Sequence, residues 1–221
     1  MILRREWARG LNLSGIVNEE LYWKVKYKIA WILKETNSED PNFEICSWLD
    51  KYLPVDKKVP KRVALASYGI LNNETNAYAL NPKDYKVKSS LREIAWINIS
   101  DEPGGASTSS ARLNSLYKTN QQKVLSQIKQ VKADVIIFGG TCSLLWNDLY
   151  ENCFSHYLNK LGFFDGKVKI KAYLQENNSG PLLVETSHPA ERSMMDCDYA
   201  SQIIMAVRAW EKDEYKLLKE W

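Results

Sequence analysis

One segment near the C-terminus combines an imidazole with several side chains that bind anions. It reads SHPAERS over residues 187–193 and directly follows the apolar run PLLVET. His188 can exchange a proton or a hydrogen bond near neutral pH, while Ser187, Arg192 and Ser193 carry donors suited to phosphate oxygens. A single histidine is more often a surface or capping residue, but these neighbours favour a functional loop.

Two glycine-containing segments offer backbone amides to an anion. Residues 103–108 read PGGAST and precede an expected helix, so the amides near Gly105, together with the Ser107 hydroxyl, could bind a phosphate. A plain capped turn explains that segment equally well. Residues 139–141 repeat the arrangement after another apolar run, and there close packing of strand against helix is the better interpretation.

The elements that must position these loops follow from hydrophobic periodicity. Short apolar runs that end in glycine or polar residues predict buried strands over 62–70, 93–100, 133–140 and 181–193 (the last with its loop), and 167–174 is a possible extra strand. Longer amphipathic stretches predict helices over 43–53, 109–131, from 141 onward, and 197–218. Residues 18–35 fit a helix, although the alternation over 22–30 also fits a strand.

The alternation of strand, loop and helix predicts an α/β fold. We expect a three-layer α/β/α sandwich with a central, mostly parallel four-stranded sheet. The whole chain, 1–221, would form a single domain, in which residues 1–60 are a helical N-terminal preface packed on the sheet. Because ligands collect at the carboxyl ends of parallel strands, four loops should meet at one crevice: 69–76, 98–108, 139–143 and 187–193.

Composition narrows the partners and the cofactors. The net charge is only +3, from 30 basic and 27 acidic residues, so affinity for phosphates must come from a local surface. The four cysteines form no CxxC pair, which favours reduced thiols over a metal cluster. No apolar run of membrane-spanning length and no signal sequence occur in the chain. We therefore expect a cytoplasmic monomer with no metal, no cofactor and no membrane partner.

Three segments resemble motifs of the uracil-DNA glycosylase superfamily. SHPAERS resembles the His-Pro-Ser motif after the last strand of those enzymes. AWINISDEPGG resembles their second strand, which ends in an asparagine that reads the base, and ADVIIFGG resembles their third strand. The three segments occur in the order and at the approximate separation found in the family, over about residues 63–208.

The resemblance implies a monofunctional DNA glycosylase, which flips a pyrimidine out of DNA and hydrolyses its bond to the sugar, leaving an abasic site. Asn98 would bind the edge of the base, and His188 would donate a hydrogen bond to a base oxygen as negative charge builds on it. DNA is the implied partner, with phosphates bound by Ser187, Arg192 and Ser193 and by the amides near Gly105 and Ser107.

In that family the first loop carries an Asp or Asn that positions the attacking water. The corresponding segment here reads SYGILNNETNAY and lacks the Pro that usually follows. The candidates for the water-positioning group are Asn72, Asn73 and Glu74, with Asp101 and Glu102 as a fallback pair. The candidates for stacking on the base are Tyr68 and Tyr78.

The tyrosine that excludes 5-substituted bases in uracil-specific relatives is not in register here. The resemblance therefore implies a substrate that is uracil or a bulky modified cytosine, such as a hydroxymethylcytosine derivative of bacteriophage DNA, and the altered first loop favours the modified base. One alternative is a non-catalytic reader of unusual bases that uses the same fold. Another is an unrelated doubly wound hydrolase or nucleotide-binding enzyme, which is disfavoured because the GxSxG, GxxxxGK[ST] and GxGxxG signatures are missing.

Overall fold

The computed structural model describes residues 15–36, 38, 40, 43–100, 108–154, 158–165, 168–175 and 180–212. These residues form a six-stranded sheet with the strand order β2-β1-β3-β6-β5-β4. The strands are β1 (Ile29–Glu35), β2 (Ile94–Ser100), β3 (Val135–Gly139), β4 (Leu158–Asp165), β5 (Val168–Gln175) and β6 (Leu182–Thr186). Neighbours among β2, β1, β3 and β6 pair in parallel, whereas β5 is antiparallel to both β6 and β4.

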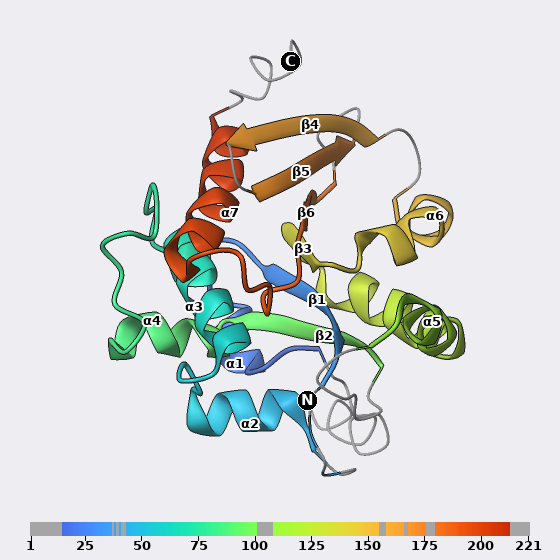
Figure 1. Ribbon diagram of the computed structural model, residues 1–221, viewed down its shortest axis with the longest axis horizontal. Helices are drawn as coiled ribbons and strands as arrows, with labels where there is room; N and C mark the ends of the chain where they lie inside the picture. The colour runs from blue at the N-terminus through green and yellow to red at the C-terminus, as the bar shows by residue number, and fades with distance from the viewer. Residues whose placement is uncertain are drawn as a thin grey trace.

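Helices cover both faces of the sheet (Figure 1). One face carries α2 (Ile45–Tyr52), α3 (Lys58–Leu71) and α7 (Asp196–Glu211), and the other carries α5 (Ser110–Val131) and α6 (Cys142–Asn152). The shorter elements are α1 (Glu19–Tyr22), α4 (Tyr85–Ser89) and the 3-10 helix η2 (Ser90–Arg92). The predicted three-layer α/β/α sandwich is therefore confirmed.

Strand β1 shows how the layers are specified by the sequence. Its residues from Ile29 to Leu33 are all buried, as expected for a parallel strand covered on both faces. Trp31 and Leu33 pack in the core beneath α3 and α7, whereas Ala30 and Ile32 pack in the core beneath α5 and α6. Successive side chains of a strand point to opposite faces, so one apolar run supplies both cores.

The expectation of a strand over 62–70 is wrong, because these residues lie inside helix α3. Almost every position from Pro60 to Ile70 is buried, since α3 packs against the sheet, α4 and α7. A helix buried on most sides loses the amphipathic period that identifies a helix in a sequence. A short apolar run without that period does not distinguish a buried helix from a buried strand.

The expectation of a helical preface over residues 1–60 is wrong at residues 29–35, while residues 1–14 of that range lie outside the described residues. Residues 29–35 form β1, which pairs with β2 on one side and β3 on the other and is thus an inner strand of the sheet. The parallel part of the sheet has the predicted four strands, but β1 takes the place expected for 62–70. Strand β5 confirms the possible extra strand, and β4 was not predicted.

The remaining predicted elements are confirmed with small shifts at their ends. They are β2, β3, β6, α2, α5, α6 and α7. Helix α7 is described as far as Glu211, and residues 213–218 of the helix expected over 197–218 lie outside the described residues. None of the helices in the described ranges is both long enough and apolar enough to cross a membrane.

The packing of α3 on β1 can be tested through one buried hydrogen bond. Trp31 Nε1 donates to Ser67 Oγ at 3.0 Å, and both side chains are buried. Ser67→Ala leaves the indole N–H without its acceptor, so we expect the free energy of unfolding to fall by about 1–3 kcal/mol in urea denaturation. The control Ser47→Ala removes an exposed hydroxyl that bonds Glu44, and should change it by less than about 0.5 kcal/mol. Equal effects would contradict this packing.

Candidate active site

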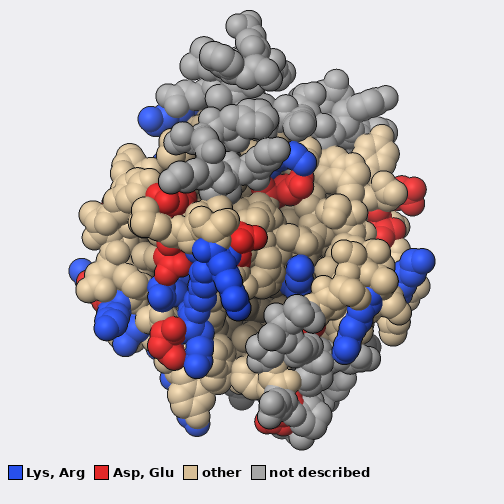
Figure 2. Space-filling view, in the orientation of Figure 1, with Lys and Arg blue, Asp and Glu red and all other residues tan. Residues whose placement is uncertain are grey.

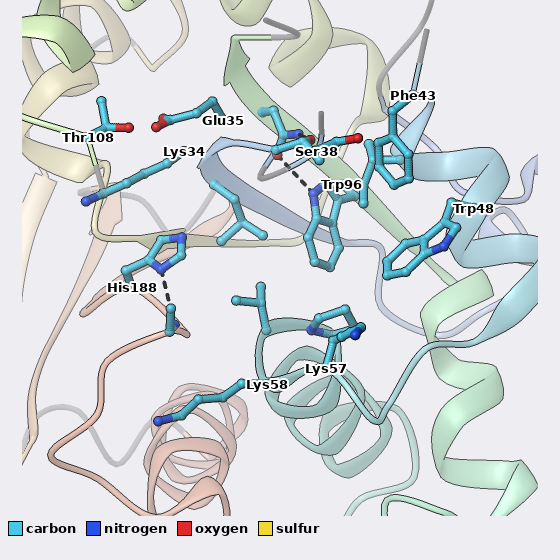
Figure 3. Close-up of a pocket in the computed structure, with 17 residues that line it drawn as sticks. Lys34, Glu35, Ser38, Phe43, Trp48, Lys57, Lys58, Trp96, Thr108 and His188 are labelled. Atoms are coloured by element: carbon cyan, nitrogen blue, oxygen red, sulfur yellow. Dashed lines mark hydrogen bonds between the residues drawn. The ribbon is translucent and has the colours of Figure 1, made fainter. Parts of the chain in front are cut away.

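A cavity of about 450 Å³ opens at the carboxyl ends of the parallel strands. Three polar groups line it from three different elements: Glu35 from the end of β1, Asn98 from β2, and His188 from the loop after β6. Figure 3 shows Glu35 and His188 on the same side of the cavity. Its apolar wall consists of Leu33, Phe43, Ile45, Trp48, Val59, Pro60 and Trp96. The structure thus brings Asn98 and His188, two residues singled out from the sequence, to a single cavity.

A missing side chain lets these elements meet. Strand β3 lies between β1 and β6 and ends at Gly139. A Cβ atom at Gly139 would lie 2.5 Å from Leu33 Cδ2 and 2.9 Å from Pro189 Cδ, so glycine allows β1 and the His188 loop to approach each other. Gly140 follows with a φ of +71°, a conformation that favours glycine, and a Cβ there would lie 3.2 Å from His188 Cβ. The two glycines therefore allow close packing, as expected. The packing is against the end of β1 and the His188 loop, and not of a strand against a helix.

The carboxamide of Asn98 is buried and held in one orientation. Its side chain is 4% exposed. Trp96 Nε1 donates to Asn98 Oδ1 at 3.0 Å, and Asn98 Nδ2 donates to Thr36 Oγ1 at 2.6 Å. Because an indole N–H can only donate, the oxygen of the amide must face Trp96. One N–H and one lone pair of the amide remain for a ligand, which is the donor and acceptor pair that the edge of a pyrimidine requires.

Glu35 contributes a carboxylate beside Asn98. In the register of the sheet, Leu33 lies opposite Asn98 and Glu35 lies opposite Ser100, so Glu35 is two residues further along the same face. Its Oε2 atom is buried and has no hydrogen-bond partner among the described residues. The carboxylate points toward Thr108, on the side of the cavity that also holds Lys34 and His188 (Figure 3). A buried carboxylate oxygen without a partner is costly, which favours a functional role.

The imidazole of His188 is locked in one tautomer. The backbone N–H of Ala190 donates to His188 Nδ1 at 3.1 Å. Since Nδ1 accepts this bond, a neutral ring must carry its proton on Nε2. His188 therefore offers an N–H donor to a ligand in the cavity.

The surroundings of His188 keep the ring neutral. Burial, and to a smaller extent the charge of Lys34, lowers the pKa of His188 from 6.5 to about 4. At neutral pH the side chain is thus an uncharged hydrogen-bond donor. Such a group can stabilise negative charge that develops on a ligand.

Positive charge is concentrated at the rim of the cavity. Lys34, Lys57 and Lys58 line it, and Glu35 is the one carboxylate among the described lining residues. On the face of the molecule in Figure 2, basic side chains gather near the centre, with acidic side chains among them. This local excess suits an anionic ligand in spite of the small net charge of +3.

The structure does not bring Asn72 or Glu74 to the cavity. Both follow the C-terminal end of α3, whereas the cavity is lined by Lys57 to Pro60 at its N-terminal end. A helix of 14 residues spans roughly 20 Å, which is too far for either side chain to reach. Asn72 instead donates from Nδ2 to the carbonyl of Tyr68. The error follows directly from the strand that was expected over 62–70.

The two tyrosines expected to stack on a base also lie elsewhere. Tyr68 is half-buried within α3 and packs against the core under that helix. Tyr78 is 64% exposed and donates its hydroxyl proton to Asp198 at 2.9 Å. Neither lines the cavity, whose aromatic side chains are Phe43, Trp48 and Trp96.

Some of the residues expected to bind phosphate are exposed, one is buried, and others lie outside the described residues. Arg192 and Ser193 are exposed on the loop after His188, and their backbone N–H groups donate to the carboxylate of Glu191. Ser187 Oγ is buried and has no hydrogen-bond partner among the described residues, so it does not reach the surface. The candidates Gly105, Ser107, Asp101 and Glu102 lie outside the described residues. Thr108, which follows them, lines the cavity.

Sequence reasoning missed Glu35, Lys34 and Trp48. Glu35 ends the run IAWILKE and precedes the polar residues TNSED, which is the same pattern of strand followed by polar loop that identified His188. Reading 29–35 as a strand would have found it. Trp48 carries no such signal, because an aromatic residue on an amphipathic helix usually belongs to the core.

No protein-family model matches the chain, and no curated protein matches it either. Among the described residues, no group of three or more His, Cys, Asp or Glu side chains is arranged to hold a metal ion. The chemistry of the cavity itself is therefore the basis for inferring a function.

The burial of His188 predicts a dependence of stability on pH. The unfolded chain binds the His188 proton near pH 6.5 and the folded chain only near pH 4. Stability from the neutral ring is therefore complete above pH 6.5 and falls as the pH drops toward 4. Chemical denaturation at a series of pH values should show a smaller loss between neutral and acidic pH for His188→Gln than for the wild type. Parallel pH profiles would contradict this assignment.

Proposed function

We propose that the chain is a monofunctional DNA glycosylase that excises a flipped pyrimidine by hydrolysis and leaves an abasic site. The observation that carries the proposal is the convergence of three groups on one cavity: the Asn98 amide, the neutral His188 N–H and the Glu35 carboxylate. The reaction has three requirements, and each group meets one of them. Asn98 recognises the base, His188 stabilises the leaving base, and Glu35 activates the water.

Asn98 recognises the base in this proposal. Its amide is fixed by Trp96 and Thr36 before any ligand binds, so its remaining N–H and lone pair are already oriented. Flipping a base out of the duplex costs a few kcal/mol, and hydrogen bonds to the exposed Watson–Crick edge help to offset that cost. A preorganised amide loses little conformational entropy when these bonds form.

His188 stabilises the departing base. When the bond between the sugar C1′ and the base nitrogen breaks, its electron pair moves onto the base, and negative charge collects on the carbonyl oxygen. The Nε2–H of a neutral His188 donates a hydrogen bond to that oxygen. The positive charge of Lys34, which acts on His188 across the same part of the cavity, adds to this stabilisation because it attracts the negative charge that develops on the base.

Glu35 activates the water. The sugar acquires positive charge as the base leaves, and a nearby carboxylate stabilises that charge. The same carboxylate accepts a proton from the water whose oxygen bonds to C1′. Glu35 thus takes the role that Asn72 and Glu74 were expected to have. The unpartnered Oε2 is the atom that would accept this proton. A non-catalytic reader would use the same oxygen only to accept a hydrogen bond from an N–H of the base, so measurement of base release separates the two functions.

Basic and hydroxyl side chains near the cavity support the proposal that a DNA strand binds there. Lys57 and Lys58 at its rim, and Arg192 and Ser193 on the loop after His188, are suited to phosphates on either side of the flipped nucleotide. This local arrangement needs no large net charge.

The cavity favours a substituted pyrimidine over uracil. Its volume of about 450 Å³ falls in the range of about 300–1,000 Å³ that accommodates a drug-sized ligand, more than a single ring requires. Phe43 and Trp48 line the part of the cavity away from His188 (Figure 3). A bulky group on the base can occupy this aromatic part while the ring contacts Asn98.

Base release can be measured on a panel of uracil-containing, unmodified and phage-type modified DNAs. We expect mass spectrometry to detect a free pyrimidine from at least one substrate and alkali to cut that strand at the abasic site. His188→Ala and Asn98→Ala should each lower kcat/KM by roughly 100-fold or more, because each removes a group that acts on the base. Binding of a DNA from the panel without base release would support the reader instead.

Glu35 and Glu74 form a matched pair of variants. Glu35→Gln removes the proposed proton acceptor, so we expect kcat to fall by roughly 100-fold or more. It also removes a buried charge whose Oε2 lacks a partner, so the free energy of unfolding should rise by about 1 kcal/mol. Glu74→Gln should leave base release unchanged. If instead Glu74→Gln loses activity and Glu35→Gln keeps it, the assignment of Glu35 is wrong.

A further inference from the structure

The loop that carries His188 is folded around a buried arginine. Arg62, from α3, is 0% exposed. Its Nη1 donates to the carbonyls of Pro189 at 3.1 Å and Glu191 at 2.9 Å, and its Nη2 donates to the carbonyl of Met194. Its Nε donates to Asp196 Oδ1 at 2.7 Å, at the start of α7. The guanidinium thus holds the backbone of the loop at three points after His188.

A tyrosine holds the same loop on the other side of His188. Tyr199, from α7, is fully buried and donates its hydroxyl proton to the carbonyl of Ser187 at 2.9 Å. Its ring lies under the guanidinium of Arg62, with 5.0 Å between the ring centroid and Cζ. Backbone carbonyls immediately before and after His188 are therefore fixed by two buried side chains that contact each other.

Burial makes this arrangement rigid. A guanidinium removed from water is tolerated only when its N–H groups are paired and its charge is balanced. Arg62 meets these conditions with the loop carbonyls and with Asp196, which also contacts Lys61 at 3.2 Å. A shift of the loop would leave donors of a buried cation without acceptors, so the loop has one favoured conformation.

We propose that Arg62 and Tyr199 are positioning residues for His188. They hold the loop so that the N–H of Ala190 reaches Nδ1, which directs Nε2–H into the cavity. The catalytic consequence rests on the proposed function, but the orientation of the ring does not.

The chain contains a matched control for Arg62. Arg208, from α7, donates to the carbonyls of Glu74, Gly69 and Ile70 and to the carboxylate of Glu211. It therefore binds three carbonyls and one carboxylate, as Arg62 does, but at the opposite end of α3. Its loss should lower stability without disturbing His188.

The test compares Arg62→Lys, Tyr199→Phe and Arg208→Lys in the full chain by ¹⁵N NMR of the histidine rings. The chain has two histidines, so His188→Gln assigns the signals. In the wild type and in Arg208→Lys we expect the proton on Nε2 at neutral pH and a His188 pKa of about 4. In Arg62→Lys and Tyr199→Phe the loop becomes more solvated, so the pKa should rise toward 6.5 and both tautomers should appear.

Kinetics of base release provide a second readout, on whichever DNA the wild type releases a base from. Arg62→Lys and Tyr199→Phe should lower kcat by roughly 10- to 100-fold with little change in KM, because a displaced group loses alignment more than binding. Arg208→Lys should have the kcat of the wild type, even if its free energy of unfolding is lowered as much as that of Arg62→Lys.

The outcomes separate the two proposals. The positioning role is overturned if His188 has the same tautomer and the same pKa in Arg62→Lys and Tyr199→Phe as it has in Arg208→Lys. Should Arg62→Lys fail to fold, Tyr199→Phe decides the question, because it retains the ring beneath Arg62 and removes only the hydroxyl that binds Ser187. A shifted tautomer in a protein whose wild type releases no base from any DNA would support the positioning role and contradict the glycosylase.

Discussion

The site depends on the absence of a side chain at Gly139. This glycine ends the strand between β1 and β6, and Leu33 and Pro189 occupy the space that a Cβ atom would need. Any larger residue would separate the end of β1 from the loop that carries His188. The cavity can therefore hold groups from β1, β2 and the β6 loop at once because the strand between two of them contributes only backbone at its end.

The polar groups of the cavity and of the loop that carries His188 are of two kinds: those whose hydrogen-bonding capacity is fully used and those with capacity left. Arg62 is buried but paired with carbonyls and a carboxylate, and Asn98 uses half of its hydrogen-bonding capacity on Trp96 and Thr36. Glu35 keeps an unpartnered oxygen, and His188 is held neutral by burial. Paired groups provide rigidity, while the incompletely paired ones carry the capacity to bind or react, at a cost in stability that the surrounding core offsets.

The candidate site could be predicted in part from sequence. His188 is recognisable because it follows a short apolar run together with several anion-binding side chains. Asn98 is recognisable because it is an amide between two buried isoleucines in a segment that resembles the second strand of the uracil-DNA glycosylase superfamily. Glu35 was missed because 18–35 has apolar residues separated by lysines, a pattern that fits both helical and strand periods. Asn72 and Glu74 were expected in the site because the mostly apolar run 62–70 has no clear helical period, since the element is buried on most sides, and it therefore resembles a strand that ends before them.

The sequence by itself determined the alternation of strands and helices, the three-layer architecture and the strand-end positions of Asn98 and His188, since local hydrophobic pattern and glycine positions are enough for these. Only the tertiary structure decided that 29–35 is an inner strand and 62–70 a helix. It also decided that Arg62 holds the His188 loop and that Glu35 shares its cavity. The reason is physical: strand pairing and the pairing of buried charges join residues far apart in the chain, and no local pattern encodes those partners.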